Sequence, residues 1–136
     1  MEYCENQRDY GGKPYVIHAR PLAVRNDNFR TAIWTGTFGQ MTMMSIPFGG
    51  DIGVELHEDT DQMIRVERGF GMVKMGKDRR LMDFCLPVRE GDVIFVPAGY
   101  WHNVMNTGDF SLKLSSVYAP SHHPKGTVNR TKEDSR

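Results

Sequence analysis

The amino-acid sequence predicts an all-β domain, built as an antiparallel sandwich or barrel. Roughly nine or ten short apolar or alternating segments are separated by turn residues, about every 8–12 positions. No segment shows the period of a convincing amphipathic helix. Closure into a barrel would also remove the open sheet edges on which strands of other chains can pair. These observations favour an antiparallel β fold with few or no helices.

The expected strands begin after a loose arm at residues 1–14 and end at residue 119, so the domain proper is expected at residues 15–119. Clusters of Asn, Asp, Gly and Pro separate the strands, because these residues adopt turn conformations at low cost. The polar tail at 120–136 is expected to wrap the barrel briefly and to fray from residue 131. The expected strands are residues 15–18, 31–35, 40–47, 53–58, 62–68, 70–76, 79–86, 93–97, 101–106 and 111–119.

The composition predicts one domain that binds neither nucleic acid nor a membrane. A chain of 136 residues can bury about two-thirds of its unfolded surface. The 17 basic and 17 acidic side chains cancel without forming a block of either sign, so there is no basic surface for nucleic acid. No apolar run approaches the roughly 18 residues of a spanning helix. The polar N-terminus is unlike a secretory signal and Cys4 and Cys85 form no CxxC pair, so we expect a cytoplasmic protein.

Four residues with metal-ligand chemistry lie in two turn-bounded stretches. Glu55 and His57 are two positions apart, and alternate residues of a strand point to the same face. Gln62 can begin the returning strand after the turn at residues 58–61, and His102 follows a Pro-Ala-Gly turn. The pattern predicts that Glu55, His57, Gln62 and His102 surround one metal ion.

The same two stretches carry a resemblance to a known family. Residues 49–69 have the spacing of the first cupin motif, G(x)5HxH(x)4E(x)6G, and residues 91–106 match the second motif at every fixed position. The chain therefore resembles a small single-domain cupin, and is similar to bacterial proteins labelled type II mannose-6-phosphate-isomerase-like. This resemblance implies a jelly-roll β-barrel around a metal ion. The fixed positions are Gly49, Glu55, His57, Gln62 and Gly69 in the first motif, and Gly91, Pro97, Gly99, His102 and Asn106 in the second.

Cupins hold their metal with three histidines and one glutamate, and this chain departs from that pattern twice. Glu55 stands where the first histidine is usual, and Gln62 stands where the glutamate is usual. The total ligand charge of −1 is unchanged, because one carboxylate and three neutral groups remain. A retained metal site is therefore expected, with a divalent transition metal such as Mn, Fe, Ni, Co or Zn.

Other roles stay open for several of these residues. Glu55 could instead be an unligated general base whose pKa the barrel interior raises, and Gln62 could be a hydrogen-bonding barrel residue. Arg30 is interpreted as a surface arginine, with binding of a substrate carboxylate as the alternative. Residues 122 and 123, both His, are expected to be exposed unless they cap the barrel mouth. Residues 100 and 101, Tyr and Trp, are expected to pack.

Three functions fit this fold, which by itself cannot choose between them. The first is a non-redox isomerase, epimerase or ring-opening enzyme for a small sugar or sugar acid, with the metal polarising a carbonyl. The second is a metal-dependent dioxygenase, for which an apolar, aromatic-lined pocket is expected. The third is a non-catalytic binding or sensor protein for a small molecule. Phosphomannose isomerase activity is not favoured, because no cluster of Lys and Arg lies near the motifs. The resemblance also implies a homodimer.

Overall fold

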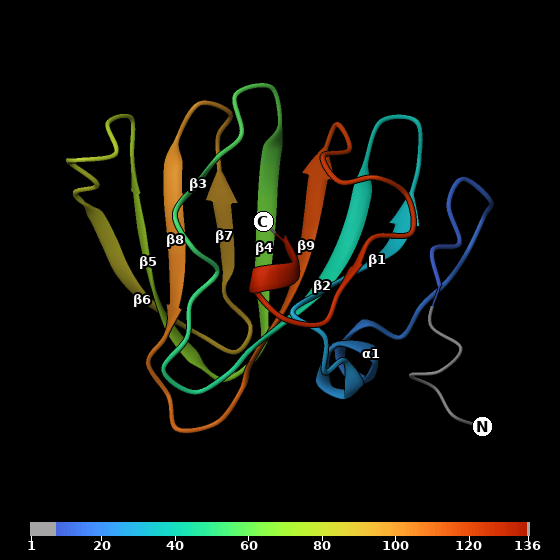
Figure 1. The fold of residues 1–136 in the computed structure, drawn as a ribbon, viewed down its shortest axis with the longest axis horizontal. Helices are drawn as coiled ribbons and strands as arrows, with labels where there is room; N and C mark the ends of the chain where they lie inside the picture. The colour runs from blue at the N-terminus through green and yellow to red at the C-terminus, as the bar shows by residue number, and fades with distance from the viewer. Residues whose placement is uncertain (1–7, 136) are drawn as a thin grey trace.

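The computed structural model describes residues 8–135, which form two antiparallel sheets that face one another. The larger sheet has six strands in the order β10-β1-β2-β9-β4-β7, and the smaller has four in the order β3-β8-β5-β6 (Figure 1). The all-β prediction and the jelly-roll architecture are confirmed. The strands are β1 (Arg30–Thr35), β2 (Gln40–Ile46), β3 (Glu55–Leu56), β4 (Asp61–Arg68), β5 (Phe70–Gly76), β6 (Phe84–Arg89), β7 (Val93–Val96), β8 (Trp101–Asn106), β9 (Leu112–Ala119) and β10 (Val128–Asn129).

The period-2 pattern of β4 shows why the sheets face each other. Gln62, Ile64 and Val66 are buried, while Met63 and Arg65 between them are exposed. Alternate residues of a strand point to opposite faces, so the buried set faces the barrel interior. The apolar interior occupies one end of the barrel and leaves the other to polar side chains. Its members are Phe29, Met44, Ile46, Ile52, Ile64, Val66, Val73, Met75, Val88, Ile94, Val96, Val104, Leu112 and Leu114.

Two expected strands are shorter than predicted. Residues 53–58 contain only the two-residue β3, since Gly53 adopts a φ of 89° that an extended strand does not use. Residues 79–83 precede β6 instead of belonging to it, because a turn closes there with the Leu81 N–H donating to the Asp78 carbonyl at 2.9 Å. The remaining strands up to residue 119, apart from the first, lie where the sequence placed them.

The sequence prediction was wrong about residues 15–25. Residues 15–18 form no strand, and a helix, α1 (Ala19–Arg25), follows them. Pro21 is tolerated because the first helical N–H groups have no partner within a helix. Seven residues are also too few to display a helical period. Leu22 and Ala23 pack against Ile33 and Met43, so burial against the sheet supports this short helix.

The C-terminal segment is ordered to Ser135, in contrast to the expected fraying. Strand β10 extends the six-stranded sheet by pairing with β1, with Arg30 opposite Asn129. A short 3₁₀ helix, η1 (Glu133–Ser135), follows, and Lys132 forms an ion pair with Asp51. The segment crosses in front of the strands in Figure 1. It thus covers one side of the barrel opening.

Part of the N-terminal arm is also tied down. The Asp9 carboxylate accepts hydrogen bonds from the backbone N–H groups of Gly11, Thr35 and Gly126, joining the arm to β1 and the tail. Residues 1–7, which the loose-arm prediction also included, lie outside the described part of the chain. Within residues 8–135, no helix is both long and apolar enough to cross a membrane.

Candidate metal centre

Pairing of β3 with β8 brings the two predicted metal-binding stretches together. Glu55 lies directly opposite His102 in this antiparallel pair, and directly opposite residues of paired strands have neighbouring side chains. His57 follows β3, where its carbonyl accepts a hydrogen bond of 2.9 Å from the Gly99 N–H. Gly99 makes this turn with a φ of 86°, a conformation that favours glycine. The Pro-Ala-Gly turn therefore ties the two motifs to each other.

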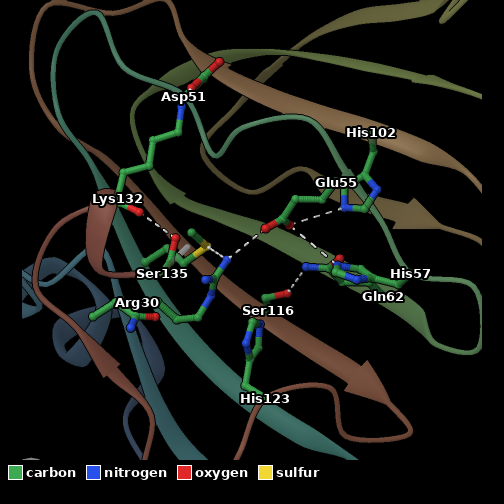
Figure 2. A network of polar contacts seen from close by, with 12 residues as sticks. Arg30, Asp51, Glu55, His57, Gln62, His102, Ser116, His123, Lys132 and Ser135 are labelled. Atoms are coloured by element: carbon green, nitrogen blue, oxygen red, sulfur yellow. Dashed lines mark hydrogen bonds and ion pairs between the residues drawn. The ribbon is translucent and has the colours of Figure 1, made fainter. Parts of the chain in front are cut away.

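Three side chains converge on one point inside the barrel. The Glu55 Oε1 atom lies 3.6 Å from His57 Nε2 and 3.8 Å from His102 Nε2. One potential ligand atom from each of the three residues lies within 4.8 Å of the others. Figure 2 shows the Glu55 carboxylate directed toward both imidazoles. The predicted grouping of Glu55, His57 and His102 is therefore confirmed as a candidate metal-binding triad.

The polar atoms left without partners at this site fit a cation. Both ring nitrogens of His57, Nε2 of His102 and Oε1 of Gln62 are buried and have no hydrogen-bond partner. Buried polar atoms are nearly always satisfied, because leaving one unpaired costs about 1–3 kcal/mol. A metal ion would accept electron pairs from these imidazole nitrogens and the amide oxygen. Nitrogen and oxygen donors of this kind suit a divalent transition metal.

His102 is held in the form that a metal requires. Its Nδ1 lies 3.1 Å from the Tyr100 carbonyl oxygen, which can only accept, so this nitrogen carries the proton. Burial lowers the pKa of His102, although the Tyr100 hydrogen bond and the Glu55 charge oppose that effect. The ring is therefore neutral, and the Nε2 lone pair is directed toward Glu55. Such a backbone partner on the outer nitrogen is typical of metal-bound histidines.

Gln62 reaches the site from the opposite sheet. Its Nε2 donates a 2.7 Å hydrogen bond to the Ser116 hydroxyl on β9, which orients the amide and leaves Oε1 free. This oxygen is the only amide atom that could bind a metal. That Gln62 is a fourth ligand stays a prediction, and Ser116 is a positioning residue that the sequence analysis missed. A lone serine in a strand carries no motif that would have revealed it.

Arg30 is not a surface residue, so that interpretation was wrong. Its side chain is 2% exposed and directs Nη2 to Glu55 Oε2 at 3.4 Å and to Met44 Sδ at 3.9 Å (Figure 2). The two oxygens of Glu55 thus have different neighbours: Oε1 faces the histidines and Oε2 faces Arg30. Arg30 begins β1, and β10 pairs with β1 beside it. Nothing in the local sequence indicated that the Arg30 side chain would be buried.

The pKa of Glu55 is lowered and not raised as expected, whereas its possible role as a base stays a prediction. Burial does act to raise the pKa of this carboxyl, but the neighbouring His57 ring and the positive charge of Arg30 outweigh burial. The net effect is a pKa below the ordinary value of a glutamate. Glu55 is therefore a carboxylate at neutral pH, which is the form that binds a metal.

Two histidines of the tail lie at the opening of the barrel. The His122 ring, which is exposed as expected, lies 4.0 Å from the His57 ring. His123 is half-buried, with Nε2 3.3 Å from the Tyr118 hydroxyl. Gln40 Oε1 accepts hydrogen bonds from both backbone N–H groups. The exposure of His122 agrees with the expectation, and whether the two residues cap the barrel mouth stays a prediction.

Residues 100 and 101 have the packing roles that the sequence suggested. Tyr100 packs against the apolar interior. The half-buried Trp101 ring lies 5.5 Å from the Arg79 guanidinium carbon, so it interacts outside the barrel. Neither side chain is part of the candidate triad.

Comparisons with known proteins agree with the motifs. The Cupin domain family matches residues 42–118. The uncharacterized protein YrkC of Bacillus subtilis is 50% identical over 127 residues, which is 93% of this chain and 68% of that protein. An oxalate-binding protein of Thermotoga maritima is 31% identical over 75 residues, covering 54% of this chain and 56% of that protein. A crystal structure from Bacillus halodurans has a TM-score of 0.93 at 47% identity, covering 94% of this chain and 97% of the other. The chain therefore belongs to the cupin family.

Proposed function

We propose that the protein is a metal-dependent catalyst of non-redox proton transfer on a small sugar or sugar acid. The observation that carries this proposal is the convergence of Glu55, His57 and His102, with Nε2 of both histidines buried and unpartnered. A divalent ion bound there supplies a Lewis acid that polarises a carbonyl oxygen and eases proton removal beside it. The class of reaction is an isomerisation, an epimerisation or a ring opening.

The protein side chains divide the remaining work. Glu55, His57, His102 and Gln62 hold the ion, with Gln62 oriented by Ser116. Glu55 would help to hold the ion, and its lowered pKa makes it a poor proton acceptor. A base must therefore come from elsewhere in the pocket. The exposed imidazole next to His57, on residue 122 of the tail, lies where it can accept a proton from a bound molecule.

The surroundings of the triad support proton transfer over oxygen chemistry. The dioxygenase hypothesis expects an apolar, aromatic-lined pocket. The described neighbours of the triad are mostly polar, namely Arg30, Ser116, Tyr118, His122 and His123. The binding of oxalate named for the Thermotoga maritima relative also supports a small, oxygen-rich ligand.

The homodimer and the cytoplasmic location stay predictions. Exposed Phe84 and Phe95 lie beside a groove of about 340 Å³, and they form a surface that a dimer would cover.

Elemental analysis of untagged protein purified without chelators tests the metal site. We expect near-stoichiometric metal in the wild type and its loss in the His57→Ala/His102→Ala double variant. His18→Ala is the matched control, since His18 is exposed and remote in sequence from both motifs. A wild type that contains no metal and takes none up on soaking overturns the proposal.

Solvent exchange then tests the reaction. The metal-loaded protein is incubated in D₂O with small ketoses and sugar acids, and NMR follows deuterium entering the carbon next to the carbonyl. Deuterium incorporation that the double variant lacks supports proton transfer. If the protein binds metal but no compound gains deuterium, the proposed catalysis is overturned and a binding function remains. Consumption of oxygen with the same compounds would favour the dioxygenase.

A further inference from the structure

Arg30 is a buried cation whose hydrogen-bonding capacity is poorly used. A guanidinium has five N–H donors, yet the Arg30 side chain is 2% exposed and its Nε has no partner. Its contact with Glu55 Oε2 measures 3.4 Å, longer than the roughly 2.7–2.9 Å of a close charged hydrogen bond. Its other contacts are to the weakly accepting sulfur of Met44 and to the Phe29 ring, whose centroid lies 5.3 Å from the guanidinium carbon. Glu55 alone does not satisfy this arginine.

The charge at the site favours a negatively charged ligand. Imidazoles that bind a metal are neutral, and Gln62 carries no charge. The Glu55 carboxylate contributes −1 and Arg30 contributes +1, so these two cancel before any metal is counted. A divalent ion then leaves an excess of about two positive charges in the barrel. An anion entering the site would offset this excess where water screens it poorly.

The positive charge of Arg30 also reaches the barrel mouth. Burial is the main cause that lowers the pKa of His123 to about 3, and the charge of Arg30 adds to it. The imidazole next to His57, on residue 122, has a pKa lowered by burial and, to a lesser degree, by Arg30. Both rings are neutral at pH 7 and can donate an N–H to an acceptor. No carboxylate besides Glu55 forms an ion pair with Arg30 among the described residues.

We propose that Arg30 is the carboxylate-binding residue of this site, so that its ligand is a small carboxylic acid and not a neutral sugar. The proposal rests on the proposed function for the adjacent metal, and it selects the sugar acid from the two classes given there. One carboxylate of the ligand would approach the Arg30 guanidinium from the side of Glu55, whose side chain is 25% exposed, while its other oxygens face the triad. A planar guanidinium fork matches a carboxylate with two parallel hydrogen bonds. A single arginine without a neighbouring lysine fits a carboxylate better than a phosphate.

Calorimetric titration of the metal-loaded protein tests this proposal with matched pairs of probes. D-glucuronate is compared with D-glucose, and malonate with malonamide, since each pair differs in the charge of the group offered to Arg30. We expect at least one carboxylate to bind about 10- to 100-fold more tightly than its neutral counterpart, which is the range of one or two charged hydrogen bonds. Failure of both carboxylates to bind, or equal binding within both pairs, overturns the proposal.

Variants separate anion binding from a structural role of Arg30. Arg30→Gln should remove the preference for the carboxylate, and Arg30→Lys should restore part of it, because the charge returns without the fork. Arg80→Gln is the control, since the Arg80 side chain is 90% exposed. If Arg30→Gln weakens both members of a pair equally, Arg30 acts only on the fold or on Glu55 and the proposal is overturned.

Metal content, measured on each sample, distinguishes the two proposals. If the wild-type protein binds metal but does not prefer a carboxylate, only the proposed role of Arg30 is overturned. If the wild-type protein binds no metal, the proposed function is overturned. The same titrations on this metal-free protein still test the role of Arg30, because its charge is present without the ion.

Discussion

Replacing Glu55 with Gln in the metal-free protein should lower its stability, because the buried charge of Arg30 then has no carboxylate partner. The substitution keeps the shape of residue 55 but leaves a guanidinium that is 2% exposed without its carboxylate. Removing one partner of a buried ion pair costs about 3–5 kcal/mol. Glu55 is 25% exposed and the pair is 3.4 Å apart, so we expect a loss of about 2–3 kcal/mol. For a domain of this size that lowers Tm by roughly 6–15 °C.

A double-mutant cycle measures this coupling. Thermal and urea unfolding are followed in EDTA for the wild type, Glu55→Gln, Arg30→Met and the protein carrying both changes. The doubly substituted protein should be more stable than the sum of the single losses predicts, because no unpaired charge remains in the barrel. Glu58→Gln is the control: Glu58 is exposed, and such surface changes usually stay within about 0.5 kcal/mol.

Two results would refute the reasoning. One is a Glu55→Gln protein with the same Tm and urea midpoint as the wild type, since the burial of Arg30 would then not depend on Glu55. The other is strict additivity in the cycle, which would mean that the two side chains do not interact. Either result would also remove the contribution of Arg30 to the lowered pKa of Glu55.

Two further predictions concern residues that support the site and the fold. Ser116→Ala removes the acceptor of the Gln62 amide, so metal affinity in a competition titration should fall about 10- to 100-fold, and an unchanged affinity would contradict the role of Ser116. Asp9→Asn should cost about 1–2 kcal/mol at pH 7, because the carboxylate accepts four hydrogen bonds, from Gly11, Thr35 and Gly126. Burial opposes the lowered pKa of Asp9, but these hydrogen bonds outweigh it, so the stability difference between wild type and variant is full above about pH 5 and shrinks as pH falls below about 4. Unfolding curves from pH 3 to 8 would show this, and a difference that grows toward acid pH would contradict it.

The parts of the fold that the sequence predicted are those with a strong local signal. Strand β4 alternates buried and exposed residues over most of its length, so the period alone predicts it. Gly91 and Gly99 have φ angles of 94° and 86°, and turn chemistry predicted both positions. The helix α1 was missed because its seven residues include Pro21. Its stability comes from packing on the sheet, which a short window of sequence does not contain.

The candidate site was predictable only where spacing carried information. Glu55 and His57 share a face because they are two residues apart, and the second motif supplied His102. Arg30 could not be placed in the same way. It follows a turn at the start of β1, a position that is usually at the surface. The strand that pairs beside it, β10, has two residues and no apolar pattern, so neither this pairing nor the burial of Arg30 could be predicted.

The two departures from the usual cupin pattern have a common physical explanation in Arg30. A carboxylate at position 55 places Oε2 near the guanidinium of Arg30, whereas the side chain at position 62 meets the hydroxyl of Ser116. The amide donates to that hydroxyl, whereas the carboxylate offsets the charge of the buried guanidinium. With the glutamate at position 62 instead, the Ser116 hydroxyl could still donate to it, but Arg30 would lose its ion pair. We therefore expect the carboxylate at position 55 and the buried arginine to depend on one another.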